Sequence, residues 1–544
     1  MKLVTVEEMR RIEREADASG LSYALMMENA GSGLADVIHE ALSCRFEKRI
    51  LGLIGSGNNG GDALVALAKL AQLGWEACAC IVKQRAEGDP LIKRLIEAGG
   101  KVIQFGGAAE APELRSLVIS HPVLLDGVLG TGARLPLAQD VAQALGAVKE
   151  IYREKTGRPY IVAVDCPSGI DCDGGGAAPE CLPADLTVTM AAVKQGMFKF
   201  PAANYVGEIQ VVSIGDLSRL PAWQGLTRFV VDASYVRSVL PERPKTAHKG
   251  TFGTALVVAG SVNYTGAALL AGKAAYRCGA GLVTLAVPVP LHAALAGHFP
   301  EATWLLLPDE MGVIVASASD VVQENLERAT AMLIGPGFGL DSATRAFVEK
   351  LFEASQTKAK KHIGFVAQGE SGKPDALTYP PCVIDADGLK LIARLKDWQQ
   401  CIPPLSVLTP HPGEMSILAG VPKEELMSDR IASAEHYAVK WGHVVIFKGA
   451  FTVIAEPGGM TAVIPVATPA LARAGTGDVL AGLVVGLRAQ GVEAFPAAAA
   501  AAWIHAQAGL LAEAELGNPA SVLAGDVLNA IPQVMRLLTQ GEKA

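Results

Sequence analysis

The sequence predicts an α/β protein built from two parallel-sheet domains. Short apolar runs rich in β-branched residues alternate with longer segments of helical apolar spacing, which is the pattern of βαβ units. This pattern stops and begins again in the second half of the 544-residue chain. Half of the residues are hydrophobic, aromatics are few, and Gly and Ala are plentiful, which suits helices packed closely on parallel sheets.

The first half is expected to hold one sheet with a helix after its first strand. The runs predicted as strands are residues 49–54, 78–82, 123–126 and 160–165. Asp62 to Leu73 shows the apolar spacing of a helix. Such sheets bind ligands at the carboxyl ends of their strands, so polar residues at those ends are the functional candidates.

The second half repeats this organisation. Its predicted strands are residues 254–259, 282–287, 331–334, 383–385 and 444–447. The segment 217–249 contains three prolines and lies between the two patterns, so we expect the domain boundary inside it. The expected domains are residues 1–217 and 225–540.

Composition excludes several classes of protein. A net charge of −8 disfavours binding to nucleic acid. The nine cysteines show neither a CxxC pair nor the spacing of a zinc site, which favours reduced thiols in the cytoplasm. The first residues form a charged amphipathic pattern and not a signal peptide. The uncharged stretch 494–512 is mostly Ala, and we expect a buried helix there and no membrane span.

A glycine-rich turn follows the first predicted strand. Residues 55–62 read GSGNNGGD and precede a helix, whose free N–H groups attract phosphate. The turn lacks the ending of a Walker A motif, and a plain tight turn would also need glycines. The adjacent amides and the carboxylate exceed what a turn requires.

Two further strand ends carry carboxylates, Asp126 and Asp165. Either could simply cap a helix, but three polar strand ends in one sheet favour a shared cleft. Asn59, Asp126 and Ser168 offer only oxygen ligands, which suit a hard cation and not zinc.

The N-terminal motifs together resemble those of the NAD(P)H-hydrate epimerase family. The resemblance covers residues 1–217 and includes residues 28–31 (ENAG), 55–62, 125–132 (LDGVLGTG), 164–171 (VDCPSGID), 184–189 and 194. It implies a Rossmann-like fold and interconversion of the R and S hydrates of the reduced cofactor at ring carbon C6. It also implies that the dinucleotide is bound by Asn58, Asn59, Gly60, Gly61 and Asp62 and by Gly130, Thr131, Gly132, Ala133, Arg134, Leu135 and Pro136.

The same resemblance assigns roles to the remaining polar residues. Asn59, Asp126 and Ser168 would hold a potassium ion, and Asp165 would face the hydrated ring as the acid/base. Three positions depart from the family pattern. Ser56 replaces a Pro, Cys166 replaces an Ile, and Ala63 replaces a Gly, which adds a methyl group near the expected phosphate site.

The strongest single motif of the second half is the run of residues 474–482, AGTGDVLAG. Gly-Thr-Gly before a helix makes an anion hole of backbone N–H groups, which phosphoryl transfer requires. Asp478 could take the proton of an attacking hydroxyl, or it could only complement the helix dipole. His411 lies between two prolines on a rigid backbone, which favours a ligand contact. Lys448 is either a solvated strand-end lysine or a phosphate contact.

These motifs, with residues 248–250, 259–261, 264–267, 335–339 and 385–389, resemble the NAD(P)H-hydrate dehydratase family. The resemblance runs from residue 225 to the C-terminus. It implies a ribokinase-like fold, phosphorylation of the C6 hydroxyl of the S hydrate by ADP or ATP with Mg²⁺, and elimination of phosphate. The residues implied for the hydrated cofactor are Ala267, Gly337, His411 and Asp478. Those implied for the adenine nucleotide are Lys448, Gly449, Ala450, Phe451, Thr452 and Gly477.

One stretch departs from that family, because residues 466–473 lack its usual Gly-Asn. Arg473 is there either a phosphate contact or a solvated loop charge. The partners expected are hydrated NADH or NADPH, an adenine nucleotide and further copies of the chain. Two alternatives stay open: a ribokinase-like kinase that releases a phosphorylated product, and an N-terminal half that acts only as an interaction module.

Overall fold

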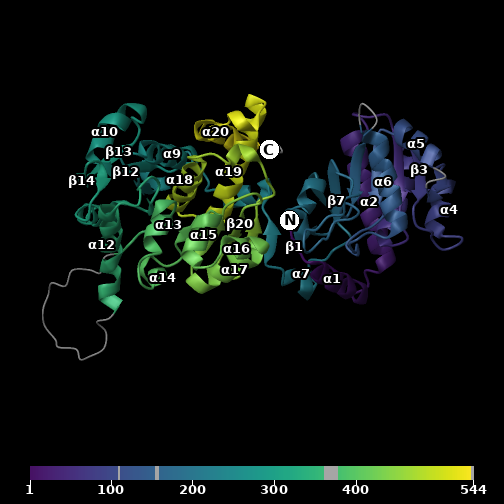
Figure 1. Ribbon diagram of the computed structural model, residues 1–544, viewed down its shortest axis with the longest axis horizontal. Coiled ribbons are helices and arrows are strands. Elements are labelled where there is room, and N and C mark those ends of the chain that lie inside the picture. Colours follow the sequence, from purple (N-terminus) through teal and green to yellow (C-terminus); the bar gives the residue numbers. More distant parts are fainter. Residues whose placement is uncertain (108–110, 154–157, 360–377, 541–544) are drawn as a thin grey trace. The chain divides into compact units, whose positions relative to one another are not determined.

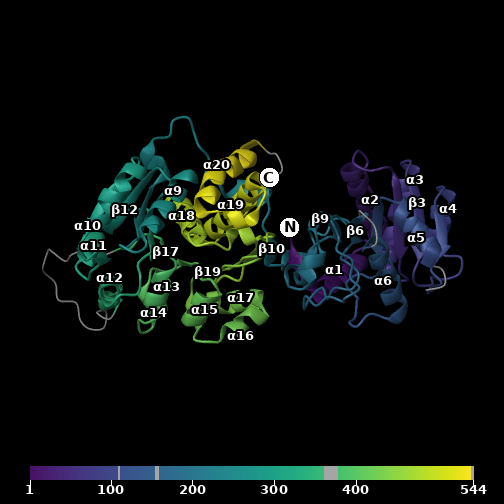
Figure 2. The ribbon, with the colours of Figure 1, turned by 45° about the horizontal axis from the view of Figure 1, so that its top comes forward.

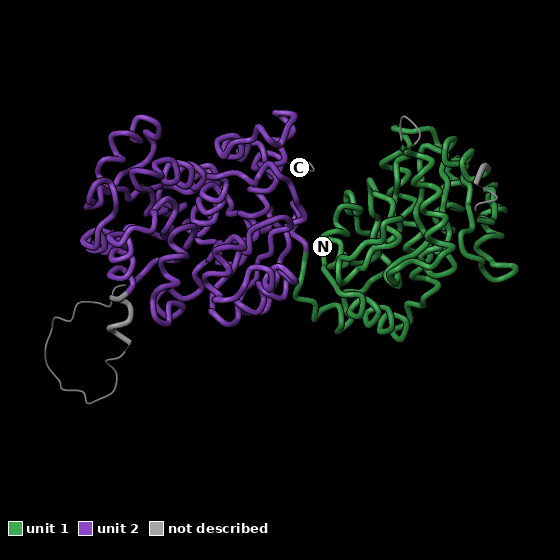
Figure 3. Tube along the Cα trace, in the orientation of Figure 1, with its two compact units in different colours: residues 1–229 green, residues 230–544 purple. Residues whose placement is uncertain are grey.

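The computed structural model describes residues 1–107, 111–153, 158–359 and 378–540. The chain divides into two units, residues 1–229 and 230–544 (Figure 3). The division lies inside the proline-containing segment 217–249. Unit 1 extends beyond residue 217, because the Ala222 amide of α7 (Pro221–Gln224) donates to the Glu15 carboxylate of α1 (Val6–Ala18) at 2.9 Å.

Unit 1 is built on a seven-stranded parallel sheet in the order β4-β3-β2-β5-β6-β7-β9. Its strands are β2 (Arg49–Ile54), β3 (Glu76–Ile81), β4 (Lys101–Gln104), β5 (Val123–Gly127), β6 (Tyr160–Val164), β7 (Leu186–Met190) and β9 (Glu208–Val212). Of these strands β2 comes first along the chain, and the order reverses between β2 and β5. This is the strand order of a Rossmann sheet, whose ligands bind at that reversal. The predicted α/β fold is confirmed.

Helices cover both faces of this sheet. They are α1, α2 (Tyr23–Leu42), α3 (Asn58–Gln72), α4 (Pro90–Glu97), α5 (Ala111–Ser120) and α6 (Gln139–Arg153). Alternate strand residues feed two separate cores: Ile50 and Ile54 pack with α1, α2 and α3, whereas Leu51 and Leu53 pack with α5 and α6. The strands are therefore apolar on both sides, which explains their continuous apolar runs. A two-stranded sheet pairs β1 (Leu3–Val4) with β8 (Val193–Lys194).

Unit 2 contains a ten-stranded sheet in the order β10-β21-β20-β19-β18-β17-β16-β11-β12-β13. Its strands are β10 (Arg228–Val230), β11 (Thr254–Val258), β12 (Leu282–Pro288), β13 (Thr303–Leu307), β16 (Ala331–Ile334), β17 (Cys382–Ile384), β18 (Val407–Leu408), β19 (Val444–Phe447), β20 (Val453–Ala455) and β21 (Thr461–Val463). The strands from β13 to β19 are parallel, and β20 and β21 add antiparallel pairs beyond β19. β14 (Asp309–Glu310) and β15 (Val313–Ile314) form a separate hairpin.

The helices of unit 2 lie on both sides of its sheet (Figures 1 and 2). One group is α9 (Thr265–Arg277), α18 (Thr476–Ala489), α19 (Ala494–Leu516) and α20 (Ala524–Gln540), and the opposite group includes α13 (Asp387–Ile392), α15 (Pro412–Ala419), α16 (Lys423–Ser428) and α17 (Arg430–Trp441). The other helices are α8 (Ala233–Val239), α10 (Val289–Leu295), α11 (Ala318–Gln323), α12 (Ser342–Ala359) and α14 (Trp398–Cys401).

Glycines in α18 explain how closely this helix packs against α9. A Cβ on Gly482 would lie 2.2 Å from the Ala271 carbonyl oxygen of α9, and one on Gly486 would lie 2.8 Å from the Ala275 Cα. Only glycine permits such close helix packing. α19 covers the stretch 494–512 and is largely buried, as expected. Among the residues that the structure describes, no helix has the length and hydropathy needed to cross a membrane.

Candidate active sites

A cavity of about 630 Å³ opens at the carboxyl ends of the unit 1 strands. Of the residues expected to bind the dinucleotide, those that line it are Asn58, Asn59, Asp62, Gly130, Thr131 and Gly132, and Asp165 lines it too. Gly60, Gly61 and residues 133–136 do not line it. The structure thus brings only part of the predicted binding set to the cavity.

The glycine turn is shaped by close backbone packing. A Cβ on Gly55 would lie 1.9 Å from the Val128 carbonyl oxygen, and one on Gly60 would lie 2.1 Å from the Gly55 carbonyl oxygen. Gly60 therefore serves packing and does not reach the cavity. The expectation that the helix begins at Asp62 is wrong, because α3 already begins at Asn58 with Gly57 as its N-cap. Asn58 and Asn59 consequently lie in the first helical turn, where free N–H groups face the cavity end.

Asp165 is held immediately after β6 with φ of 62°, a conformation that Asp tolerates better than most residues. Its Oδ1 accepts hydrogen bonds from Thr189 Oγ1 at 3.1 Å, from the Met190 amide at 3.0 Å and from the Lys194 ammonium. The Lys194 side chain is only 1% exposed and also donates to Thr189 Oγ1 at 2.9 Å. This network fixes the direction of the Asp165 carboxylate toward the cavity.

Two more carboxyl groups share this end of the cavity. Burial, together with the charges of Asp165 and Glu13, raises the pKa of Asp62 well above its ordinary value. Burial also raises the pKa of Glu13, which α1 contributes. A protonated carboxyl beside the Asp165–Lys194 pair can donate a proton while Asp165 accepts one. Paired groups whose environments differ in this way are typical of acid–base sites.

The three residues predicted as cation ligands lie around one backbone carbonyl. Asp126 accepts from the Ser168 hydroxyl at 2.5 Å and from the Ser168 amide at 2.8 Å. Asn59 donates to the Leu129 carbonyl at 3.0 Å, and the Leu129 amide donates to Ser168 Oγ at 2.8 Å. Asp126 is fully buried, and burial raises its pKa although the Ser168 hydrogen bonds oppose this. Of the three predicted ligands, Asn59 lines the cavity, whereas Asp126 and Ser168 are fully buried and do not line it.

The departures from the epimerase pattern leave this cavity intact. The Ala63 methyl is fully buried, and a Cβ on Gly127 would lie 2.6 Å from it. The extra methyl group therefore packs against β5 and does not reach the phosphate region. Ser56 lines the cavity, and Cys166 is buried beneath it.

A second cavity, of about 420 Å³, lies in unit 2 at the N-terminus of α18. The residues expected there that line it are His411, Lys448, Gly449, Ala450, Thr452 and Gly477. Phe451, Ala267, Gly337 and Asp478 are not among its lining residues. Ala267 and Gly337 abut each other, since a Cβ on Gly337 would lie 2.8 Å from the Ala267 Cβ.

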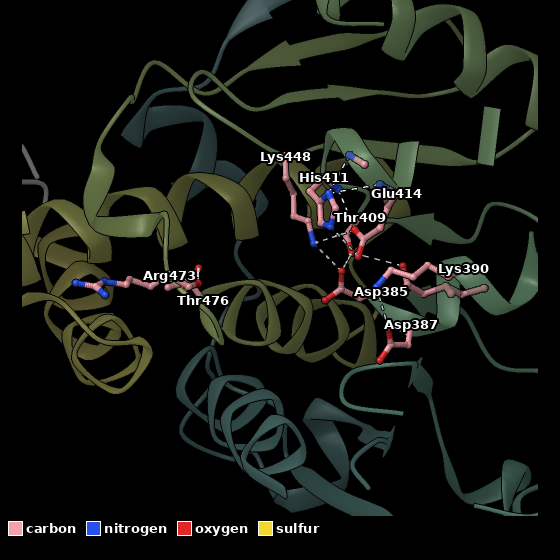
Figure 4. A network of polar contacts seen from close by, with 11 residues as sticks. Asp385, Asp387, Lys390, Thr409, His411, Glu414, Lys448, Arg473 and Thr476 are labelled. Atoms are coloured by element: carbon pink, nitrogen blue, oxygen red, sulfur yellow. Dashed lines mark hydrogen bonds and ion pairs between the residues drawn. The ribbon is translucent and has the colours of Figure 1, made fainter. Parts of the chain in front are cut away.

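Lys448 is not a free solvated lysine, because it joins a polar network at the strand ends (Figure 4). Its ammonium donates to Asp385 Oδ1 at 2.8 Å and lies 3.8 Å from Glu414 Oε2. Asp385, 1% exposed, also accepts from Thr409 Oγ1 at 2.5 Å. Burial alone would lower the pKa of Lys448, but Asp385 and Glu414 outweigh it and the pKa is raised. The lysine therefore stays charged beside the cavity.

Asp478 and Glu414 are the acids in this network that titrate near neutrality. Burial, reinforced by the nearby Asp385, raises the pKa of Asp478 to about 7. Burial likewise raises the pKa of Glu414 to about 7. Asp478 lies in the first turn of α18, so it combines the helix terminus with the pKa of a general base.

His411 is the N-cap of α15. Its Nδ1 accepts from the Gly413 amide at 3.0 Å, and its Nε2 lies 3.3 Å from Glu414 Oε1. Burial, with the charge of Lys448, lowers its pKa, so the ring is neutral at pH 7. The ring orientation is thereby fixed at the cavity edge.

Arg473 contacts protein and extends away from the Lys448 network (Figure 4). Its guanidinium donates to the Ala520 carbonyl, although the residue lines the rim of the cavity. Arg430 was not foreseen: it donates to the Phe447 carbonyl at 2.7 Å and to the Ala450 carbonyl, and so holds the 448–452 loop. Glu13 was also missed, because nothing in a charged surface helix signals a cavity residue.

The fold and the two cavities define a class: a two-unit α/β protein with one cavity at the strand ends of a Rossmann-type sheet and another at a helix N-terminus. Family models match both units. A model described as NAD(P)H-hydrate dehydratase matches residues 255–364 and 375–533, and one described as YjeF-related protein N-terminus matches residues 24–196.

Two curated relatives span nearly the whole chain. The bifunctional NAD(P)H-hydrate repair enzyme Nnr of Moorella thermoacetica is 34% identical over 99% of this chain and 98% of the relative. The enzyme of the same name from Salinibacter ruber is 35% identical over 95% and 92%. A solved ADP/ATP-dependent NAD(P)H-hydrate dehydratase of Bacillus subtilis, crystallised with ATP/Mg²⁺, is 30% identical with a TM-score of 0.45, over 56% of this chain and 97% of that one. The chain belongs to the family of bifunctional NAD(P)H-hydrate repair enzymes.

Proposed function

We propose that the chain repairs hydrated NADH and NADPH in two reactions. Unit 1 interconverts the R and S hydrates at C6, and unit 2 dehydrates the S form with ADP or ATP through phosphorylation and phosphate elimination. The observation that carries the proposal is the presence of two strand-end cavities, one lined by Asp165 and the other at the N-terminus of α18, whose first turn contains Asp478. Because the dehydratase uses one epimer, the epimerase supplies it with the other.

In unit 1, Asp165 is the proposed acid/base at the C6 hydroxyl. Lys194 forms an ion pair with this carboxylate and fixes its direction, while Asp62 is the carboxyl that burial favours in its protonated form. One carboxyl would donate a proton as the C6–O bond breaks and the hydroxyl leaves as water. A carboxylate would then take a proton from the water that attacks C6 from the opposite face, which inverts C6. The glycine turn and residues 130–132 are proposed to bind the phosphates and ribose of the dinucleotide.

Oxygen atoms of Asn59, Asp126 and Ser168 fit a potassium ion, which would place a positive charge beside the substrate phosphates. In unit 2, Asp385 and Glu414 are the carboxylates nearest Lys448, and they fit Mg²⁺ bound through the nucleotide phosphates. A divalent ion there would screen phosphate charge during transfer.

In unit 2, Asp478 is the proposed base that takes the proton of the C6 hydroxyl as it attacks the terminal phosphate. The backbone amides at the start of α18, preceded by Gly475 with φ of 89°, would stabilise the charge of the transferring group. Lys448 and the 448–452 loop would hold the nucleotide. We also propose a cytoplasmic, homo-oligomeric enzyme, with ADP as the preferred phosphate donor.

The pH profile of dehydration tests the assignment of Asp478. The base form of a carboxyl with a pKa of about 7 is lost as the pH falls, so kcat/KM should decrease about tenfold per unit below pH 7 and level off above it. Glu414→Gln removes a nearby negative charge that raises the pKa of Asp478, so the acid limb should move to lower pH. A profile that stays flat from pH 5 to pH 8 would exclude Asp478 as the base.

Potassium should stabilise unit 1 through Asp126. A cation at about 100 times its Kd stabilises a fold by about 2.7 kcal/mol, which raises Tm by several degrees in a domain of this size. We expect KCl to raise Tm more than choline chloride does in the wild type but not in Asp126→Asn. Asp36→Asn, which alters an exposed aspartate paired with Lys69, is the control and should keep the potassium effect. An undiminished effect in Asp126→Asn contradicts the site.

A further inference from the structure

The unit 1 cavity is lined by different charged side chains at its two ends. Glu13, Asp62 and Asp165 are the carboxylates among the described residues that line it. Asp165 follows β6, and its partner Lys194 ends β8. Lys83 also lines the cavity but follows β3, and β2 and β5 separate β3 from β6 in the sheet. The carboxylates at the Asp165 end are accompanied by two cations that also line the cavity, Lys194 and Arg10, whereas Lys83 lines its other end.

The position of Lys83 is fixed beside the glycine turn. The Lys83 amide donates to the Ile54 carbonyl, the last residue of β2, at 3.3 Å. Two residues on, Arg85 donates to the Gly55 carbonyl at 2.8 Å and the Gly57 carbonyl at 3.2 Å. The segment after β3 is thus tied to the turn that leads into α3, where phosphates are expected.

The carboxylates near Lys83 are either paired with another residue or only weakly paired with Lys83. Asp89 is bound to Arg85 at 2.7 Å, so it is not available to a ligand hydroxyl. Asp140 lies 4.0 Å from the Lys83 ammonium with 46% of its side chain exposed, and such an exposed pair is weak. The Lys83 ammonium is therefore available to contact a ligand.

The proposed role of Asp165 orients a dinucleotide in the cavity. A hydrated ring beside Asp165 leaves the adenosine half toward β3 and Lys83. In sheets of this strand order, an acidic residue about 20 residues after the glycine turn binds the ribose 2′-hydroxyl, whereas a basic one accommodates a 2′-phosphate. Lys83 occupies that position.

We infer that Lys83 binds the adenosine 2′-phosphate and makes the hydrate of NADPH the preferred substrate of the epimerase. This inference rests on the proposed epimerisation at the same site and names the substrate class. Lys83 is a specificity-determining residue and takes no part in proton transfer at C6, so its replacement should change KM and leave kcat unchanged.

The test measures KM for epimerisation of NADPH hydrate and of NADH hydrate without added nucleotide, so that only unit 1 acts. Lys83→Ala should raise KM for NADPH hydrate roughly tenfold, which is the loss expected for one charge-assisted contact, and leave KM for NADH hydrate unchanged. Lys83→Arg should keep the preference, and Lys83→Glu should reverse it. Lys93→Ala, which removes an exposed lysine of α4 outside the cavity, is the matched control.

Competitive inhibition gives a second measurement, which does not require turnover of NADPH hydrate. Adenosine 2′,5′-bisphosphate should inhibit epimerisation of NADH hydrate more strongly than 5′-AMP does in the wild type, and equally in Lys83→Ala. Equal KM changes for both hydrates, or no change in either, would overturn the inference while epimerisation itself persists. Absence of epimerisation in the wild type would instead overturn the proposed function and the inference with it.

Discussion

Replacing Asp478 with alanine should abolish dehydration of the hydrate and leave epimerisation at the wild-type rate. The physical reason is that Asp478 combines the N-terminus of α18 with a pKa of about 7, so it can accept the hydroxyl proton at neutral pH. Loss of a positioned general base costs about 10²- to 10⁴-fold. Dehydration is followed by recovery of dihydronicotinamide absorbance with ADP or ATP, and epimerisation by chromatographic separation of the epimers without nucleotide.

The control for this variant is Asp526→Asn, which changes another first-turn aspartate of a unit 2 helix, one that caps α20 through the Leu523 amide. It should keep both activities. The isosteric Asp478→Asn should fail as the alanine variant does, because the amide cannot accept the proton. Dehydration at the wild-type rate in Asp478→Ala would remove this residue from the chemistry.

Replacing Asp165 should have the opposite result, with epimerisation lost and dehydration of the S hydrate retained. The carboxylate at the cavity end is the group expected to exchange protons with the C6 hydroxyl, so a decrease of about 10²- to 10⁴-fold is expected. Asp165→Ala also leaves the buried Lys194 ammonium without its carboxylate, which by itself destabilises a fold by about 3–5 kcal/mol. The Ala side chain is also disfavoured at φ of 62°.

Asp165→Asn separates chemistry from stability. Asn tolerates the left-handed conformation and still accepts hydrogen bonds from Thr189 and the Met190 amide. Asp165→Asn combined with Lys194→Met removes both charges of the pair. The double variant should be more stable than a variant that leaves the buried Lys194 ammonium without a counterion. Both forms should have folded unit 1 by circular dichroism and still fail to interconvert the hydrates. Epimerisation in either of them would show that Asp165 is not the acid/base.

Much of the fold could be predicted because a parallel sheet buried on both faces leaves continuous apolar runs. The strand runs of both halves were found within a few residues of β2, β3, β5 and β6 and of their counterparts in unit 2. The strand order could not be predicted, because local sequence carries no record of which strands pair. The start of α3 was placed too late, since two asparagines and two glycines give little helical signal.

The sites were predicted where motifs follow strands and missed where contacts join distant segments. Asp165 and Asp478 lie where strand ends and helix starts were expected. The pairing of Lys448 with Asp385 joins residues 63 positions apart, and no spacing rule gives it. Gly60 was expected at the ligand because glycines permit close approach, whereas its neighbour is the Gly55 carbonyl. The Ala63 methyl group lies against Gly127, a contact between segments that sequence spacing does not reveal.

The alternative of an N-terminal interaction module is disfavoured by the three carboxyl groups in the unit 1 cavity. A protein-binding surface needs no buried lysine paired with a carboxylate and no carboxyl with a strongly raised pKa beside them. A kinase that releases its product and the proposed dehydratase both begin with phosphoryl transfer. They differ in the final product, because the kinase would accumulate a phosphorylated hydrate whereas the dehydratase returns the reduced cofactor.

The central claim is tested most directly by supplying a mixture of R and S hydrates with ADP or ATP and following dihydronicotinamide absorbance. The wild type should return both epimers to the reduced cofactor, whereas Asp165→Asn should stop once the S fraction is consumed. Accumulation of a stable phosphorylated hydrate without recovery of absorbance would contradict the account.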